Sequence, residues 1–121
     1  MVYIAWMLFH ITTRQAWKDA LDAGEYVPAT FVADGFIHLS EERQWFRTAR
    51  RFFRGQRDLL LLVIDERRLG AEVRREPADG ELFPHLYGRL NLDAVISAYD
   101  LPLDKNGDVL APATLDIGLV N

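Results

Sequence analysis

The chain of 121 residues contains no cysteine. Its absence excludes disulfide bonds, thiolate metal sites and a cysteine nucleophile, and it suits a reducing compartment, so we expect a cytoplasmic protein. A long apolar run is lacking too, because the stretch Val2–Ile11 falls well short of the roughly 20 residues that a membrane span needs. No basic residue precedes this stretch and no small-residue cleavage pattern follows it, which argues against a signal peptide. We therefore expect no membrane partner.

An excess of positive charge is also missing. Lys and Arg number 14 against 18 Asp and Glu, which gives a formal net charge of −4. A general attraction to nucleic acid is therefore not expected, and any polyanion must bind locally. Hydrophobic residues make up 50% of the chain and aromatic residues 12%, which favours a real core over a disordered chain. Two cores would leave each half too small, so we expect a single domain over residues 1–121.

The first segments predict a strand followed by an amphipathic helix. The apolar run Val2–Ile11 is typical of a central strand covered on both faces. Thr12 or Thr13 suits the N-cap of the next helix, Gln15 is able to complete a capping box to Thr12, and Gly24 ends the helix. The apolar stripe of this helix consists of Ala16, Trp17, Ala20 and Leu21.

A second strand and a second helix follow the stretch from Tyr26 to Asp34, which carries Pro28 and polar breaks. Strand alternation gives the segment Phe36–Ser40 one core face and one face that can line a cleft. Ser40 suits the N-cap of a helix whose first turn holds Glu41 and Glu42, and Gly55 ends that helix. The cleft face carries Phe36, His38 and Ser40, and the helix carries an apolar stripe of Trp45, Phe46, Ala49, Phe52 and Phe53.

The second half of the chain is dominated by strand patterns. Leu59–Ile64 is an unbroken apolar run that favours an interior strand. Asn106 and Gly107 form a strong hairpin turn because both accept positive φ. Further strands are predicted at Glu72–Glu76, ended by Pro77, around Phe83–Gly88, and at Ala94–Tyr99. The fold class is therefore α+β, with a mainly antiparallel or mixed sheet and helices against it.

All three histidines lie in apolar or aromatic segments, at His10, His38 and His85. Burying an imidazole requires hydrogen bonds or a function, and the three together indicate one shared cleft. Each is also explained, taken singly, as a structural histidine bonded to backbone carbonyls. Two further alternatives are a zinc site made by the three rings and a histidine base beside Ser40 or Thr12 as nucleophile. Neither has a recognisable motif, so the predicted site holds no metal.

One helix carries a stripe of arginines in an otherwise acidic chain. Its three- and four-residue spacing places Arg47, Arg50, Arg51 and Arg54 on one face, and arginine forks match phosphate geometry. One hypothesis is therefore a contact for RNA or a phosphorylated acceptor between Arg43 and Arg57. The alternative is a solvated face balanced by nearby acidic residues. Those residues are Glu41, Glu42, Asp58 and the segment Asp79–Glu81.

At these residues the sequence resembles a family of small, mostly bacterial proteins known as domain-of-unknown-function family nine-five-two. The resemblance extends from Tyr3 to about Ala98 and rests on several blocks in combination. These blocks are Phe9-His10-Ile11-Thr12, Trp17 with Ala20, Gly24-Glu25-Tyr26, Gly35-Phe36-Ile37-His38-Leu39-Ser40 with Gln44, and Phe83-Pro84-His85-Leu86-Tyr87-Gly88.

More distantly, the run His38-Leu39-Ser40 resembles a strand of the RNA 2′-phosphotransferases, enzymes with the ADP-ribosyltransferase fold. This resemblance implies a curved, split and mainly antiparallel sheet with flanking helices, and NAD as the cofactor. It also implies that His10 and His38 anchor ribose and that Glu76 supplies a carboxylate to the transition state. Phe9 departs from the pattern, because the phosphotransferases have an arginine there.

The resulting hypothesis is an ADP-ribosyltransferase-like domain that binds NAD or a related nucleotide in the histidine cleft and transfers or hydrolyses ADP-ribose. The alternatives are a non-catalytic nucleotide- or phosphate-binding module and a histidine-ligated metal hydrolase. The predicted catalytic residues are His10, His38 and Glu76. The predicted cofactor-binding residues are His10, Thr12, His38, Ser40, His85 and Tyr87.

Overall fold

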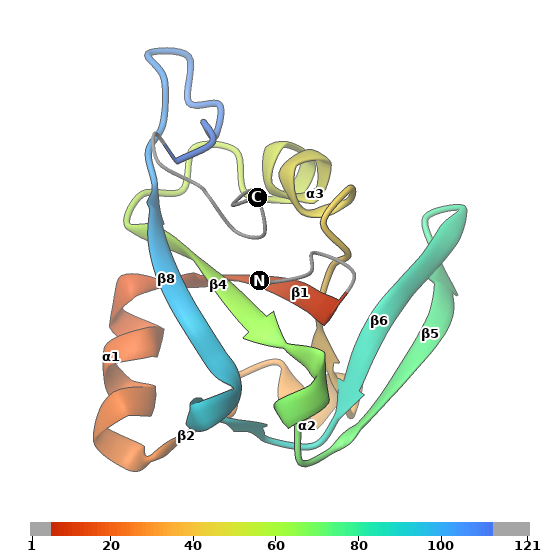
Figure 1. Ribbon diagram of the computed structural model, residues 1–121. Helices are drawn as coiled ribbons and strands as arrows, with labels where there is room; N and C mark the ends of the chain where they lie inside the picture. Colours follow the sequence, from red (N-terminus) through yellow and green to blue (C-terminus); the bar gives the residue numbers. More distant parts are fainter. Residues whose placement is uncertain (1–5, 113–121) are drawn as a thin grey trace, which may run out of the picture.

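The computed structural model describes residues 6–112, which form three antiparallel sheets with helices packed against them. The first sheet has the order β1-β4-β8, with β1 at Met7–Thr13, β4 at Leu59–Asp65 and β8 at Val95–Leu101. The second pairs β2 (Glu25–Tyr26) with β7 (Leu90–Asn91). The third has the order β3-β6-β5, with β3 at Ile37–His38, β6 at Glu81–Tyr87 and β5 at Glu72–Ala78. The predicted α+β class with a split, mainly antiparallel sheet is thus confirmed (Figure 1).

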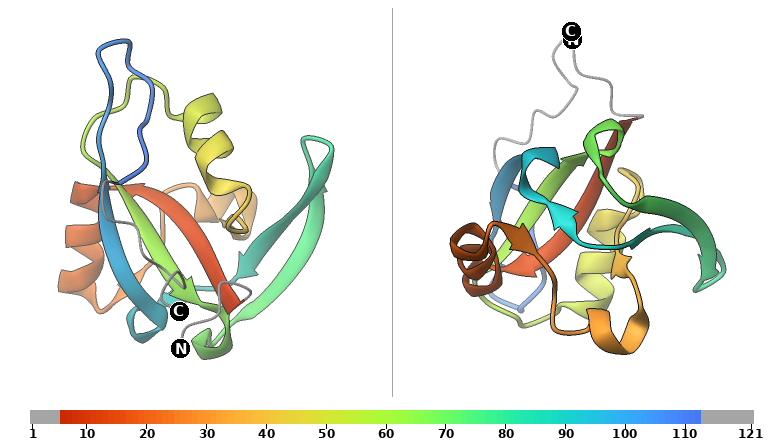
Figure 2. Two further views of the ribbon diagram at one scale, coloured as in Figure 1. Left: turned by 45° about the horizontal axis from the view of Figure 1, so that its top comes forward. Right: turned by 90° about the horizontal axis from the view of Figure 1, so that it is seen from below.

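Three α-helices connect these strands within the described range: α1 at Arg14–Ala23, α2 at Phe31–Asp34 and α3 at Trp45–Phe52. Two short 3-10 helices lie at Glu66–Arg68 and Leu92–Ala94. The long hairpin of β5 and β6 extends away from the β1-β4-β8 sheet, with the start of α3 between them (Figure 2). The two three-stranded sheets are therefore separate, and they meet near β3.

The interior strand of the first sheet is β4, as its apolar run predicts, and all seven of its residues are buried. The prediction that the first strand is central is wrong, because β1 lies at the edge of this sheet. Both of its faces are nevertheless covered, since Phe9 belongs to one core cluster and Leu8 to another. Residues 2–5 of the expected strand lie outside the described residues.

A single bridge joins the two larger sheets. Phe9 and Ser40 exchange two backbone hydrogen bonds, with N to O distances of 2.9 and 2.8 Å. Two residues earlier, β3 pairs with β6. The segment from 37 to 40 therefore lies between β1 and β6 and connects the sheets through backbone hydrogen bonds.

Helix α1 follows the sequence prediction closely. The Thr13 hydroxyl caps its start by accepting from the Ala16 backbone N–H at 3.0 Å, and Gly24 ends it with φ at +85°. Within the predicted stripe Ala20 is buried, but Leu21 is 56% exposed. Gln15 donates to Asp19 instead of completing a capping box.

The expected start of the arginine-rich helix is wrong by about a turn. Helix α3 begins at Trp45, because the backbone of Ser40 pairs with β1 and cannot serve as an N-cap. Glu41 and Glu42 therefore precede the helix. Trp45 and Ala49 pack into the core beside β1 and β4, whereas Phe52 of the predicted stripe is 52% exposed.

Strand β5 also runs further than predicted. It continues through Pro77 to Ala78, where the chain turns at Asp79 and Gly80 with positive φ. A proline is tolerated there because β5 is an edge strand and its outer side needs no donor. The predicted turn at Asn106 and Gly107 is present, with Gly107 at φ +86°.

Gln44 fastens the hairpin to the start of α3. Its side chain is fully buried, accepts from the Glu41 backbone N–H at 2.9 Å, and donates to Glu81 Oε1 and the Leu82 carbonyl, both at 2.8 Å. Replacing Gln44 with leucine keeps most of the volume but removes all three hydrogen bonds of this buried side chain, so we expect a loss of about 2–3 kcal/mol in the free energy of unfolding. Urea denaturation measures this loss. The same change at the exposed Gln56 should alter stability by less than about 0.5 kcal/mol, and equal effects at both sites would contradict this role of Gln44.

Candidate functional site

The pairing of β3 with β6 brings His38 and His85 directly opposite each other. Their ring centroids are 5.5 Å apart in an edge-on arrangement. Phe36 stacks on His85 at 3.9 Å and tilts toward Tyr87 at 5.4 Å. Alternation along the strands sends the neighbours of these residues, Ile37 and Leu86, into the core on the opposite side.

Glu76 joins this group from β5. Its Oε1 accepts a hydrogen bond from the Tyr87 hydroxyl at 2.5 Å and lies 2.8 Å from His85 Nδ1. These two hydrogen bonds lower the pKa of Glu76, the Tyr87 bond having the larger effect. The same bond raises the pKa of Tyr87. The predicted grouping of Glu76, His85 and Tyr87 is therefore present in the structure.

Asp34 is a member of the site that sequence reasoning missed. Its Oδ2 lies 2.9 Å from His38 Nε2. Asp34 is the last residue of α2, whose C-cap Gly35 has φ +79° and turns the chain into β3. The four-residue spacing from Asp34 to His38 was the available signal, but Pro28 and the polar breaks gave no indication of a helix. We call the six side chains of this surface the histidine face: Asp34, Phe36, His38, Glu76, His85 and Tyr87.

His10 does not extend the histidine face with its own ring. Its Nδ1 lies 2.6 Å from the backbone oxygen of His38, and its Nε2 lies 2.9 Å from the Tyr26 hydroxyl. The Tyr26 hydroxyl also bonds with Thr12 Oγ1 at 2.9 Å. His10 thus contacts the backbone of the segment from 37 to 40, while the side chain of His38 is 59% exposed on the histidine face.

The surroundings of His10 keep its ring neutral. Burial is the main cause that lowers the pKa of His10 to about 4, and it outweighs the hydrogen bond to the His38 backbone oxygen, which raises this pKa. A carbonyl oxygen only accepts hydrogen bonds, so the hydrogen of the neutral ring is on Nδ1, while Nε2 lies beside the Tyr26 hydroxyl. Burial also raises the pKa of Tyr26. Both ring nitrogens of His10 are therefore engaged inside the protein.

The two predicted hydroxyl residues have different environments. Thr12 is buried and bonded to Tyr26. Ser40 is buried as well, but its hydroxyl forms no hydrogen bond to another of the described residues. Every fully buried side-chain nitrogen or oxygen between residues 6 and 112 has a partner, so the Ser40 hydroxyl must reach solvent.

Within the described part of the chain, no group of three or more His, Cys, Asp or Glu residues is placed to hold a metal ion. The helices between residues 6 and 112 include none that is long and apolar enough to cross a lipid bilayer.

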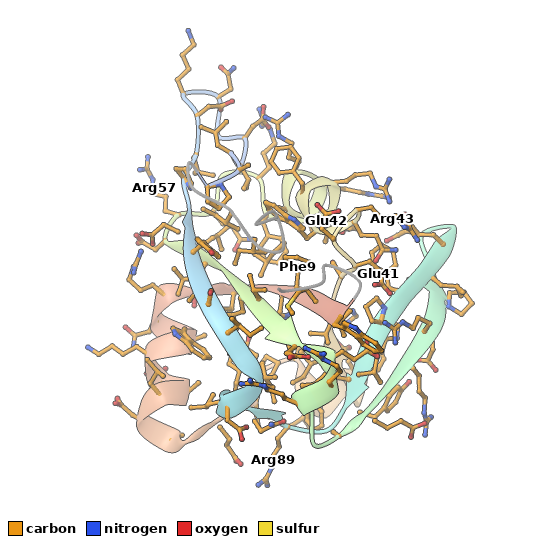
Figure 3. All side chains as sticks on the ribbon, in the orientation of Figure 1. Phe9, Glu41, Glu42, Arg43, Arg57 and Arg89 are labelled. Atoms are coloured by element: carbon orange, nitrogen blue, oxygen red, sulfur yellow. The ribbon has the colours of Figure 1, made fainter. Side chains whose placement is uncertain are left out.

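Acidic residues pair with four arginines of the segment from Arg43 to Arg57. Arg43 and Arg47 both bond to Glu81 of the hairpin, and Figure 3 places Arg43 beside the far end of β6. Arg54 bonds to Asp108 at 3.0 Å, and Arg51 lies 3.8 Å from Asp79. The ion pairs agree with the alternative of a charge-balanced face. A phosphate-bearing partner on α3 stays a prediction.

Together these features define a small α+β protein with a cluster of two imidazoles, two carboxylates and a phenol, in which His38 is exposed and His85 is buried. The chain belongs to the family described as Protein of unknown function (DUF952), whose model matches residues 11–98. This confirms the first resemblance drawn from the sequence.

The fold is similar to the crystal structure of protein CC0527 from Caulobacter crescentus. That chain is 38% identical, the match covers 86% of this chain and 93% of that one, and the TM-score is 0.80. The solution NMR structure of CC0527 matches with 38% identity, coverage of 84% and 90%, and a TM-score of 0.74. No curated protein matches this chain.

Proposed function

We propose that this protein is an ADP-ribosyltransferase-like domain that binds NAD or a related nucleotide on the histidine face and transfers or hydrolyses its ADP-ribose. The observation that carries the proposal is the pairing of His38 and His85 beside the Glu76 carboxylate. One nitrogen of each ring, His38 Nδ1 and His85 Nε2, forms no hydrogen bond to the described residues. These nitrogens are suited to bind the hydroxyl groups of a ribose.

The backbone arrangement gives independent support. The resemblance to RNA 2′-phosphotransferases implies that a histidine on the first strand and a histidine-leucine-serine strand share one site. Here the bridge between Phe9 and Ser40 aligns these two segments side by side. His10 then acts as a positioning residue, because its Nδ1 holds the backbone oxygen of His38.

The chemistry can be assigned to atoms of the histidine face. The bond between ribose C1′ and the nicotinamide nitrogen breaks, and its electron pair leaves with nicotinamide. An oxygen of water or of an acceptor hydroxyl bonds to C1′, and its proton passes to solvent water. The ionised Glu76 stabilises the positive charge that develops on the ribose ring during this exchange.

A non-catalytic nucleotide-binding module is the second candidate, and one observation favours it. Glu76 Oε1 is already occupied by both the Tyr87 hydroxyl and His85 Nδ1. A carboxylate oxygen occupied in this way holds two ligand-contacting side chains in place more readily than it responds to a charge that develops on the ligand.

Titration of isotope-labelled protein with NAD, ADP-ribose and nicotinamide tests the proposal. NAD should shift the backbone amide signals of residues 36–40 and 83–87, and His38→Ala should weaken its binding about tenfold, because the variant lacks a hydroxyl acceptor. Lys18→Ala is the control, since Lys18 is exposed on α1 and has no contact with the histidine face. Binding that is equally strong in both variants, or no response to any of the three compounds, would rule the proposal out.

Release of nicotinamide separates the two candidates. An enzyme should liberate nicotinamide from NAD in the presence of water or an added acceptor, and Glu76→Gln should abolish the release while leaving NAD bound. A binding module should show the same amide shifts without any release.

A further inference from the structure

We infer that the histidine face recognises a ribose by its free 2′,3′-diol and rejects a ribose that carries a phosphate on either hydroxyl. This inference rests on the proposed function and makes it more specific. It differs from what the resemblance to RNA 2′-phosphotransferases implies, because those enzymes act on a 2′-phosphate.

Each of the two rings carries its hydrogen on the nitrogen that bonds to a carboxylate. Carboxylate oxygens only accept hydrogen bonds, so a ring nitrogen that bonds to a carboxylate must carry a hydrogen. His38 therefore has its hydrogen on Nε2, which donates to Asp34. His85 has its hydrogen on Nδ1, which donates to Glu76. In the neutral rings the remaining nitrogens, His38 Nδ1 and His85 Nε2, are acceptors only.

The two rings differ in their exposure to solvent. The side chain of His38 is 59% exposed, whereas that of His85 is only 7% exposed. Every fully buried side-chain nitrogen or oxygen among residues 6–112 has a hydrogen-bond partner. His85 Nε2 has none among these residues, so this atom must reach solvent. A ligand on the surface can therefore contact the exposed ring of His38 directly, and the ring of His85 only through its small exposed part.

Glu76 supplies a further acceptor through its second carboxylate oxygen. Both hydrogen bonds to Glu76 end on Oε1, and its Oε2 bonds to none of the described residues. The histidine face thus offers three unoccupied acceptor atoms from two rings and one carboxylate. A vicinal diol supplies two hydroxyl donors close together, which matches such a set. A phosphate supplies acceptor oxygens and no donor at all once it is fully ionised.

The surroundings of the histidine face carry more negative than positive charge. With neutral imidazoles, the residues on and beside the face carry three carboxylates, those of Asp34, Glu72 and Glu76, against one guanidinium, that of Arg74. Arg74 is itself occupied, because it bonds to Glu72 at 3.1 Å and lies 4.3 Å over the Tyr87 ring. A phosphate placed on the diol would meet lone pairs and net negative charge. The pyridinium ring of a bound nicotinamide riboside, which is positive, is favoured by the same charge.

The tautomers can be measured without any ligand. Long-range nitrogen–proton correlation spectra of the imidazole rings at pH 7.5 should show the hydrogen of His38 on Nε2 and the hydrogen of His85 on Nδ1. The opposite tautomer on either ring would overturn the inference, because the free nitrogen would then be a donor.

The specificity is tested with three isomers of equal composition: adenosine 5′-, 2′- and 3′-monophosphate. The 5′ isomer has a free diol and should bind about tenfold or more tightly than the other two. NAD is titrated in parallel as the reference ligand. Asp34→Ala should reduce the preference for the 5′ isomer, because it frees the His38 tautomer, and Asp22→Ala on the exposed side of α1 is the matched control.

The outcomes separate this inference from the proposed function. Binding of NAD together with equal affinity for the three isomers, or tighter binding of the 2′ isomer, overturns the inference and leaves nucleotide binding in place. Binding of NAD without binding of the 5′ isomer also overturns it, because the diol is then not what is recognised. Failure of all four compounds to bind removes the proposed function and the inference together.

Discussion

Replacing His10 with alanine is expected to lower the free energy of unfolding by about 2–4 kcal/mol. The ring packs against Tyr26 of the core cluster that contains Leu8, and its removal takes one hydrogen bond from the His38 backbone oxygen and one from the Tyr26 hydroxyl. Urea denaturation monitored by tryptophan fluorescence measures this loss. The same substitution at the exposed His38 should cost less than about 1 kcal/mol.

The comparison of the two histidines separates support from ligand contact. His38→Ala should keep the fold and lose binding, whereas His10→Ala should lose stability first. His10→Gln is the conservative control, because its amide can donate to the His38 oxygen, and it should restore about half of the lost stability. An alanine variant at position 10 that is within about 0.5 kcal/mol of the native protein would contradict the supporting role of His10.

The second large effect is a loss of stability in mild acid. The pKa of His10 is about 4 in the folded protein, because burial disfavours the charged ring, whereas an unfolded histidine titrates near 6.5. Below pH 6.5 the unfolded chain takes up a proton that the folded protein does not, so stability falls until the pH reaches about 4. Above pH 6.5 both states are neutral at this position and the penalty is absent. The total linked loss is roughly 3 kcal/mol.

Denaturation curves at half-unit steps from pH 4 to pH 7.5 measure this loss. His10→Gln has no titrating group at this position, so its stability should fall by roughly 3 kcal/mol less than that of the native protein over the same range. The pKa values of Glu76 and Glu81 are also lowered in the folded protein, so both groups make the protein less stable as the pH falls. Both carboxylates remain in the variant, so their effects cancel in the comparison. Parallel stability curves for the two proteins would show that His10 is not held neutral by burial.

The sequence predicted the elements that have strong local signals. The apolar run of β4, the capped helix α1 and the Asn-Gly turn all lie where their patterns indicate. The errors arose where tertiary pairing overrides a local signal. Ser40 has the chemistry of an N-cap, but its backbone is used by Phe9, so α3 starts later. Pro77 normally ends a strand, but the unpaired outer side of β5 tolerates it.

The site was predicted in part, and again local patterns were predicted correctly while tertiary arrangements were not. His38, His85, Glu76 and Tyr87 come together because strand alternation and pairing place them on one face, and alternation is visible in a sequence. The expectation of one hollow shared by three rings did not account for the segment from 37 to 40, whose backbone separates His10 from the other two. Asp34 was missed, although its spacing to His38 is visible in the sequence, because α2 is a single turn without a hydrophobic stripe. Only the three-dimensional structure shows that its carboxylate bonds to His38 Nε2.

The most direct test of the ligand site follows the imidazole nitrogens of all three histidines while NAD is added. Binding on the histidine face predicts that the signals of His38 Nδ1 and His85 Nε2 move at saturating NAD, while both nitrogens of His10 keep their free values. Movement of the His10 signals with no change at the other two rings would contradict the account, since the nucleotide would then bind on the opposite side of the segment from 37 to 40.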